Sequence, residues 1–270
     1  SKNYLELNSI YKKDIKILPL LNKNKTISRF LDLDITKALI PVECVIMAGG
    51  RGKRLSPLTD NIPKPMIRID NKPIIEHNID RLIKFGIKKI HISVNYLAEQ
   101  IESYFGDGSS KGIEIKYIYE NKKLGTAGAL SLIDNIETNN ILLMNSDLFT
   151  NINFEKLFLR FTNDDLDMAI SSKKYKVDLP YAVFETKESS IINLSEKPTY
   201  SYNTNAGVYM LKKEHIELIP KNKFYDITDL ISVLIDKGKC ISHVPINGYW
   251  IDIGSPDDLK YAQQLIQNLD

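Results

Sequence analysis

The sequence predicts an α/β fold: a Rossmann-like, mixed and mostly parallel sheet flanked by helices. From residue 42 onward, short apolar runs typical of buried strands alternate with segments of helical periodicity. Such alternation implies βαβ units with right-handed crossovers. The first apolar run ends in a basic, glycine-rich loop, and ligands of open parallel sheets bind at the carboxyl ends of the strands. The sequence shows no hexapeptide repeat, so we expect no β-helical tail.

Composition limits the partners and the compartment. The chain has 270 residues and 43% hydrophobic content, enough for one large domain or one domain with a fragment. A net charge of +2, with acids and bases interspersed, favours neither nucleic acid nor an anionic membrane as partner. No apolar run is long enough to span a membrane, and no secretory leader is visible. Cys44 and Cys240 lie far apart and the four histidines do not cluster. We therefore expect buried free thiols, no zinc site and a cytoplasmic protein.

The first 40 residues differ from the rest. Apolar runs at 15–21 and 26–31, separated by a polar turn, predict a β-hairpin. An isolated hairpin is marginal in water, so this one either packs on the main domain or belongs to another one. The pattern over 15–34 resembles the closing hairpin of a CBS module. We therefore divide the chain into an N-terminal hairpin and linker at 1–40, the remnant of a regulatory domain or a native extension, and a main domain at 41–270.

The remaining elements follow in order. Strands are predicted at 42–47, 88–94, 113–119 and 141–145, and helices at 73–85, 97–105, 127–136, 154–161 and 228–236. An antiparallel hairpin is predicted over 181–186 and 190–194. The last helix begins at Ser255, a typical N-cap residue, followed by Pro256 at the first helical position.

The loop after the first strand of the main domain is built to hold phosphate. Gly49, Gly50 and Gly52 free the backbone for close approach, and their N–H groups form a concavity for phosphate oxygens. The basic residues between them add charge. The spacing does not match a Walker loop. It also fails the dinucleotide fingerprint, whose third glycine is replaced by Leu55. Farther on, Lys64 stands between two prolines that hold its backbone extended.

This stretch, 45–65, resembles the signature of the sugar-1-phosphate nucleotidyltransferases, G-G-x-G-x-R-L-x-P-L-T followed by P-K-P. Only Lys53 departs from it, at a position where the family usually has threonine. The resemblance implies a glycosyltransferase-A-like fold. It also implies an enzyme that transfers a nucleotidyl group from a nucleoside triphosphate to a sugar 1-phosphate, releasing pyrophosphate and forming an NDP-sugar.

Two aspartates are candidate metal ligands. Asp147 follows the apolar strand 141–145, and Asp252 lies between apolar residues before the last helix. A carboxylate at the carboxyl edge of the sheet is suited to hold Mg²⁺ over phosphates, although an aspartate there is often just a helix cap. The resemblance makes Asp147 and Asp252 the two Mg²⁺ ligands.

The resemblance also assigns binding residues. It implies nucleotide contacts from two loops, comprising Ala48, Gly49, Gly50, Gly52, Arg54, Lys64, Gly125 and Thr126. It implies sugar-phosphate contacts from Tyr181, Glu196, Lys197, Asn205 and Gly207. Ala182 stands where many relatives have a glycine whose backbone approaches the sugar, and this leaves the exact pose of the sugar open.

The catalytic residues would be Arg54, Lys64, Asp147 and Asp252. The sugar phosphate attacks the α-phosphorus in line, and catalysis is mostly positioning and charge stabilisation. Arg54 should stabilise the leaving pyrophosphate, Lys64 should contact the α-phosphate and Lys197 should hold the incoming phosphate. The attacking phosphate is already anionic near neutral pH, so no general base is needed.

The sequence L-G-T-A-G at 124–128 looks like the mannose- and heptose-1-phosphate guanylyltransferase branch, which makes GTP the expected nucleotide. A CBS-like piece ahead of the transferase also resembles guanylyltransferases that use glucosamine 1-phosphate in nonulosonic acid synthesis. The main alternative is a catalytically silent regulatory homologue that binds sugar nucleotides. A dinucleotide-dependent oxidoreductase is excluded by the missing third glycine and by the absence of a fitting acid after the second strand. A homo-oligomer stays open.

Overall fold

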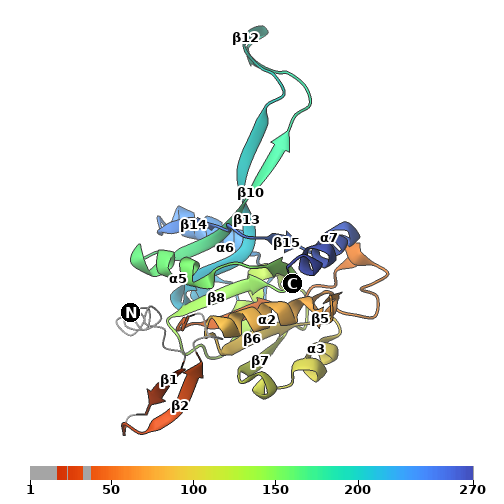
Figure 1. The fold of residues 1–270 in the computed structure, drawn as a ribbon. Coiled ribbons are helices and arrows are strands. Elements are labelled where there is room, and N and C mark those ends of the chain that lie inside the picture. Colours follow the sequence, from red (N-terminus) through yellow and green to blue (C-terminus); the bar gives the residue numbers. More distant parts are fainter. Residues whose placement is uncertain (1–16, 23, 33–37, 270) are drawn as a thin grey trace.

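The computed structural model describes residues 17–22, 24–32 and 38–269, and its centre is a seven-stranded sheet (Figure 1). The strands lie in the spatial order β14 (Ile241–Pro245), β10 (Met168–Asp178), β13 (Thr199–Lys212), β8 (Asn140–Asn145), β3 (Glu43–Met47), β6 (Lys89–Val94) and β7 (Glu114–Tyr119). β13 is antiparallel to both of its neighbours, and every other pairing in the sheet is parallel. The predicted mixed, mostly parallel sheet is confirmed.

Helices cover both faces of this sheet and bury its alternating side chains. Along β8, Leu142 and Met144 belong to the core that also contains side chains of α2 (Ile74–Lys84), α3 (Ala98–Phe105) and α5 (Phe154–Asn163). The residues between them, Ile141 and Leu143, belong to the core formed with α6 (Ile227–Asp236). Strands buried on both faces read as continuous apolar runs, which is why their positions were predictable. None of the helices among the described residues has the length and apolar character that a bilayer-spanning segment needs.

The last helix, α7 (Pro256–Gln267), begins as predicted. The Ser255 side chain accepts a hydrogen bond from the backbone N–H of Asp258, and Pro256 occupies the first turn. Leu259 and Ala262 bury their side chains in a third, smaller core together with Ile251 and Ile253. Asp252, one of the two predicted metal ligands, stands in the sequence between Ile251 and Ile253 of this core.

The helix predicted at 127–136 is wrong. Only a short α-helix, α4 (Gly125–Gly128), and a 3-10 turn, Ala129–Leu132, form there. The backbone N–H groups of Ala127 and Gly128 both donate to the carbonyl of Tyr225, at 3.1 and 2.9 Å. A tertiary contact thus takes the place of the regular helical pattern, despite the helix propensity of the alanines and leucines.

The prediction of two buried free thiols is half right. Cys44 is buried, which raises the pKa of its thiol, but Cys240 is exposed.

The N-terminal hairpin forms as predicted, with β1 (Ile17–Leu21) antiparallel to β2 (Ile27–Asp32). Its interpretation as part of a CBS-like domain stays a prediction, because residues 1–16 and 33–37 lie outside the described part of the chain. The domain boundary at residue 40 falls just after that gap.

The predicted second hairpin, β11 (Val183–Lys187) and β12 (Ser190–Ser195), forms as well. Its setting was not predicted. β10 and β13 continue beyond the sheet as a two-stranded ribbon, and the hairpin sits at the far end of it, well away from the body of the protein (Figure 1). We call residues 172–205 the ribbon.

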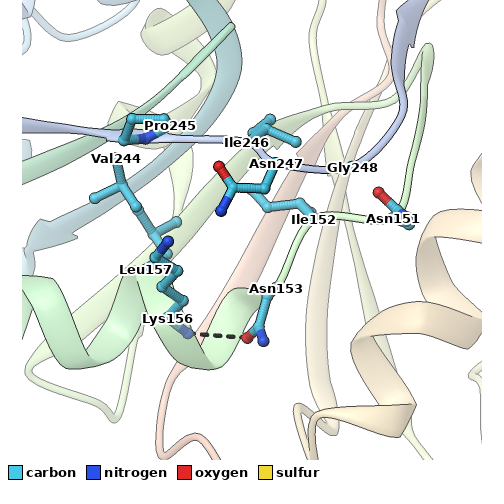
Figure 2. Close-up of a pocket in the computed structure, with 10 residues that line it drawn as sticks. All are labelled: Asn151, Ile152, Asn153, Lys156, Leu157, Val244, Pro245, Ile246, Asn247 and Gly248. Atoms are coloured by element: carbon cyan, nitrogen blue, oxygen red, sulfur yellow. Dashed lines mark hydrogen bonds between the residues drawn. The ribbon is translucent and has the colours of Figure 1, made fainter.

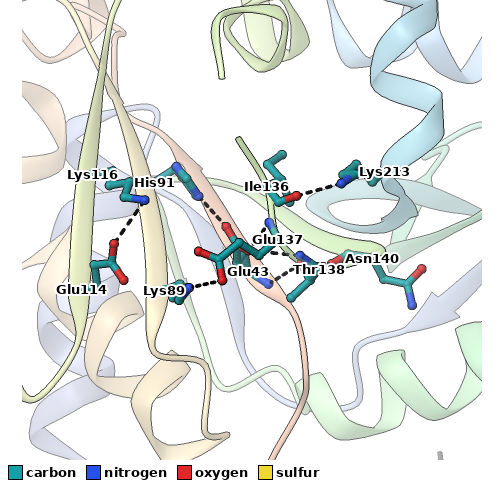
Figure 3. A network of polar contacts seen from close by, with 10 residues as sticks. All are labelled: Glu43, Lys89, His91, Glu114, Lys116, Ile136, Glu137, Thr138, Asn140 and Lys213. Carbon is teal, nitrogen blue, oxygen red and sulfur yellow. Dashed lines mark hydrogen bonds and ion pairs between the residues drawn. The ribbon is translucent and has the colours of Figure 1, made fainter. Parts of the chain in front are cut away.

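A buried carboxylate ties the start of β3 to the segment before β8 (Figure 3). One oxygen of Glu43 accepts from the backbone N–H groups of Glu137 and Thr138, at 2.7 and 3.1 Å. The other lies 2.8 Å from Nε2 of His91. Burial works to raise the pKa of Glu43, but the hydrogen bonds from His91, Glu137 and Thr138 together outweigh it and hold the pKa below its ordinary value.

This pKa predicts pH-dependent stability. Since the pKa of Glu43 is lower in the folded state, its contribution is present above the unfolded pKa and is lost as the pH falls through the folded pKa. We expect Glu43→Gln to lower the free energy of unfolding by about 1.5–3 kcal/mol at pH 7, and this deficit to shrink below pH 4. Urea unfolding at several pH values measures it. Glu137→Gln, which changes an exposed carboxylate paired with Lys89, is the control and should have little effect. A deficit independent of pH would contradict the assignment.

Candidate active site

A cleft of about 230 Å³ opens at the carboxyl ends of β3 and β8. Its lining includes Gly49 and Gly50 from the glycine-rich loop, Lys64 from the P-K-P segment, and Asp147 from the turn after β8. This is the edge of a parallel sheet at which ligands of such folds bind. The sequence-predicted loops therefore do meet at one place.

The two predicted metal ligands, Asp147 and Asp252, both lie near the ammonium group of Lys64. The ammonium of Lys64 pairs with Oδ2 of Asp147 and lies 3.9 Å from Oδ1 of Asp252. The backbone explains how residues about a hundred positions apart meet. β15 (Trp250–Asp252) pairs antiparallel with β9 (Leu148–Thr150), and the N–H of Ile253 donates to the carbonyl of Asp147 at 3.0 Å.

Lys64 is fixed by its neighbours. It starts a 3-10 turn, Lys64–Met66, after the extended Pro63, and its side chain is largely buried. Gly52 lies under it with a φ of 67°, and a Cβ added there would come within 2.8 Å of the Lys64 Cβ. Thr59 holds this loop by donating to the carbonyl of Gly52 at 2.9 Å. Gly52 is thus required both for its backbone conformation and for the passage of the lysine.

Arg54 reaches the same cluster from another side. It lies in the 3-10 turn Lys53–Leu55, and its guanidinium would be 3.4 Å from a Cβ built on Gly254. Leu55 and Ile253 pack in the same small core, so the apolar neighbours of Arg54 and Asp252 hold these two residues together. Burial, followed by the nearby Asp147 carboxylate, raises the pKa of Asp252, while Lys64 and Arg54 only partly oppose this.

The other predicted nucleotide residues take mixed roles. The N–H of Ala48 donates to the carbonyl of Ser93, so Ala48 is a buried part of the sheet edge. Gly125 lines the cleft with a φ of 82°. Thr126 also lines it, but its N–H and hydroxyl lie 2.9 and 3.2 Å from Oδ1 of Asp226. Thr126 therefore pins this loop to the start of α6.

The predicted sugar-binding residues separate into two groups. Asn205 and Gly207 lie on β13 near the cleft: Gly207 has a φ of 72° and packs against Asn145, which lines it. Tyr181, Glu196 and Lys197 are exposed at the junction between the β10–β13 ladder and the β11–β12 hairpin. The structure does not bring these three to the cleft of their own chain.

The cleft also holds residues that were not predicted. The most informative is Glu120, a buried carboxylate directly after β7. It accepts from the hydroxyl of Ser93 and, at 3.0 Å, from the N–H of Leu124. A Cβ on Gly49 would lie 2.6 Å from its Oε1, so the first glycine leaves room for this carboxylate. Its position at the carboxyl end of a strand was the one available signal.

A second cavity of about 230 Å³ lies between the start of α5 and residues 244–248 (Figure 2). Lys156 is the charged residue in its lining, beside amides such as Asn151 and Asn247. The Asn153 side chain caps α5 by accepting a hydrogen bond from the backbone N–H of Lys156 at 2.9 Å. This cavity offers no carboxylate and no paired charges in its lining, so the cleft at β3 and β8 is the candidate active site.

The fold is α/β, and its cleft combines a glycine-rich loop with the Lys64 ammonium and a pair of aspartates, an arrangement suited to phosphates. The comparisons make the class specific: residues 43–268 match the model of the nucleotidyl transferase family. The chain belongs to this family.

The chain is also similar to individual proteins and solved structures. The chain is 34% identical over 230 residues to D-glycero-alpha-D-manno-heptose 1-phosphate guanylyltransferase of Aneurinibacillus thermoaerophilus, covering 84% of this chain and 99% of that protein. It is 36% identical over 237 residues to bifunctional protein GlmU of Methanococcus vannielii, covering 82% of this chain but only 54% of that protein. The solved structure of HddC from Yersinia pseudotuberculosis complexed with GMP-PN is similar, with a TM-score of 0.63 and 26% identity over 83% of this chain and 99% of that one.

The raised pKa of Asp252 leads to a stability prediction for the metal-free protein. A carboxyl group whose pKa is raised on folding stabilises the fold only while protonated, and this contribution is lost as the pH rises through the folded pKa. We therefore expect Asp252→Asn to raise the melting temperature at pH 7 in chelator, and to change it little at pH 3. Differential scanning calorimetry measures both. Asp257→Asn removes an exposed acid from the first turn of α7, and as control it should leave the melting temperature unchanged or slightly lower.

Proposed function

We propose that this protein transfers a guanylyl group from GTP to the phosphate of a sugar 1-phosphate, releasing pyrophosphate and forming a GDP-sugar. The observation that carries the proposal is the meeting of Lys64, Asp147 and Asp252 beside the glycine-rich loop. All four candidate catalytic residues, including Arg54, belong to this one site. This argues against a binding-only homologue, which has no need of the complete set.

The residues suit the charge problem of this reaction. Two polyanions must approach, and the sugar phosphate oxygen attacks the α-phosphorus in line as pyrophosphate leaves. In this proposal the Lys64 ammonium, held inside the cleft, contacts the α-phosphate. Arg54, at the rim of the aspartate pair, stabilises the charge that grows on the pyrophosphate. No side chain is required as base, because the attacking phosphate is already anionic.

Asp147 and Asp252 fit a magnesium ion. Both carboxylates lie within 4.0 Å of one ammonium nitrogen, so their oxygens can share a single small cation. Hard oxygen ligands are those that Mg²⁺ prefers, with phosphate and water filling the remaining positions. When bound, the ion would neutralise phosphate charge and thereby reduce the repulsion between the two substrates.

The base assignment is supported by Glu120. The Watson–Crick edge of guanine presents N–H donors. An ionised carboxylate is an acceptor with about four lone-pair sites. Ser93 and Leu124 use part of that capacity, which leaves acceptor sites in the cleft wall. GTP is also the nucleotide indicated by the name of the heptose 1-phosphate guanylyltransferase and by the GMP-PN complex of HddC. The sugar is proposed to be a heptose, mannose or glucosamine 1-phosphate, and use of cytosolic nucleotides would place the protein in the cytoplasm.

The test is pyrophosphate release by the purified chain across GTP, ATP, CTP, UTP and dTTP, each with mannose, heptose, glucosamine and glucose 1-phosphates. GTP should exceed every other nucleotide by at least ~10-fold in kcat/KM, because a mismatched base leaves polar groups unpaired. A preference for dTTP or UTP would move the protein to another branch of the family, and no release with any pair would refute transferase activity.

Glu120→Gln should reduce selectivity for GTP. The amide replaces one acceptor oxygen by a donor that faces the N–H groups of guanine, so we expect a loss of ~10- to 100-fold in kcat/KM for GTP. The reaction with ATP should change less. Steady-state kinetics with both nucleotides measure this, and the melting temperature reports any general loss of folding. Glu114→Gln, on the exposed start of β7, is the control. Unchanged preference for GTP in a folded Glu120→Gln protein would remove Glu120 from base recognition.

Arg54→Ala should lose about 100-fold in kcat, or roughly 3 kcal/mol of transition-state stabilisation, without loss of folding. The loop provides a matched control: the Arg51 guanidinium lies 5.1 Å from the ring centroid of Tyr96, whereas the Arg54 guanidinium lies beside Gly254 and acts on Asp252. Arg51→Ala should therefore retain nearly full kcat. Equal losses in the two variants would show that the loop needs only general positive charge.

A further inference from the structure

Phe224 is an exposed aromatic residue in the wall of the cleft. It is one of the residues that line the cleft, and 55% of its surface is accessible. A single exposed apolar residue on an open surface needs no explanation, but an accessible ring in a concave, polar site is typical of ligand binding. The Nζ of Lys123 lies 5.9 Å from the ring centroid, at the outer limit of a cation–π contact. Most of the ring stays accessible to a ligand.

The backbone next to Phe224 is fixed to the loop at 124–128. The N–H of Tyr225 donates to the carbonyl of Leu124 at 2.8 Å. The carbonyl of Tyr225 accepts from the N–H groups of Ala127 and Gly128, at 3.1 and 2.9 Å. Three hydrogen bonds thus hold the residue that follows Phe224, so the exposed ring stands on an anchored backbone.

Two glycines of this loop allow the close contact. A Cβ built on Gly125 would lie 2.7 Å from the carbonyl oxygen of Tyr225. A Cβ built on Gly128 would lie 2.8 Å from the carbonyl oxygen of Lys223. Any side chain at either position would meet the backbone that carries Phe224. The glycines at 125 and 128 therefore serve to seat Phe224 in the cleft wall.

One residue links this ring to the carboxylate that we assign to base recognition. The N–H of Leu124 donates to Oε2 of Glu120 at 3.0 Å, while its carbonyl accepts from Tyr225 at 2.8 Å. The backbone of Leu124 thus fixes Glu120 relative to the segment that carries Phe224. Proteins recognise a nucleobase by hydrogen bonds to its edge together with stacking on an aromatic side chain, and this wall offers both.

We propose that the Phe224 ring is the face on which the guanine base of the nucleotide stacks, while Glu120 binds the edge of the base. The inference rests on the proposed function. Every base has a π-face, so stacking adds affinity without choosing between bases, whereas hydrogen bonds to an edge do choose. The two residues therefore have separate tasks: Phe224 supplies affinity for purine nucleotides in general, and Glu120 supplies the preference for guanine.

Isothermal titration calorimetry with GDP, ADP and inorganic triphosphate, all in the presence of Mg²⁺, tests the proposal. Phe224→Ala should weaken the binding of GDP and of ADP by a similar factor, ~10- to 100-fold, because stacking is tolerant of the base. Inorganic triphosphate has no base, so its affinity should not change. Phe224→Trp should retain GDP affinity, because indole also offers a flat face. Tyr261→Ala, which removes a ring of 59% exposure from α7, is the matched control and should bind GDP normally.

Three results would overturn the proposal. Phe224→Ala could bind GDP as tightly as the wild type does, it could lose inorganic triphosphate to the same extent, or it could lose GDP while keeping ADP. The second result would show a general change of the cleft, and the third would assign base choice to Phe224. Glu120→Gln should give the complementary pattern, a changed ratio of GDP to ADP affinity.

These titrations do not depend on turnover. If no substrate pair gives pyrophosphate, the transfer function fails, while the comparison of GDP with inorganic triphosphate still decides whether the Phe224 ring stacks on the base. The melting temperature of each variant reports whether the fold is intact, and an exposed ring such as Phe224 should contribute little to it.

Discussion

The contact on which the site depends is the placement of one buried ammonium between two carboxylates. The antiparallel pairing of β9 with β15 brings Asp147 and Asp252 together, and their negative charges repel each other. Lys64 offsets part of this repulsion from a position that two prolines and the bare backbone of Gly52 define. Burial, followed by the Asp147 carboxylate, keeps the pKa of Asp252 above its ordinary value despite Lys64 and Arg54. The cleft is therefore preorganised for additional positive charge, and the fold bears the cost of that preparation.

The rest of the architecture supports this contact. β3 and β8 run parallel at the centre of the sheet and deliver the glycine-rich loop and Asp147 to the same edge. α7 and the strand before it pack in a separate small core that also includes Leu55, next to Arg54. The side chains that handle charge thus come from four segments, but each stands beside a buried apolar neighbour. Rigid packing next to each polar group is what holds such a constellation in place.

Local sequence patterns were sufficient for much of this fold, for reasons that particular elements show. Strands such as β8 are buried on both faces and are apolar throughout, and Ser255 with Pro256 is a strong local signal for a helix start. The helix predicted at 127–136 was wrong, because hydrogen bonds to Tyr225, about a hundred residues away, override the helix propensity of this segment. The positions of Glu120 after a strand and of Asp226 before a helix are local signals, but the contacts that these residues make in the cleft arise only when distant loops meet. The length of the ribbon was equally invisible, because an exposed two-stranded ladder buries neither face and leaves no alternation of polar and apolar residues.

Asp226 links the cleft loop at Thr126 to the start of α6. Its carboxylate takes part in the capping box that starts α6, and the same carboxylate holds the N–H and hydroxyl of Thr126 in the cleft wall. The hydroxyl of Thr126 in turn accepts from the N–H of Ile227 at 2.9 Å. Fraying of the first turn of α6 and loosening of the loop at Gly125 are consequently one cooperative opening. A ligand that orders the loop would slow amide hydrogen exchange at the start of α6, so this helix end is a natural place to read occupancy of the cleft from outside it.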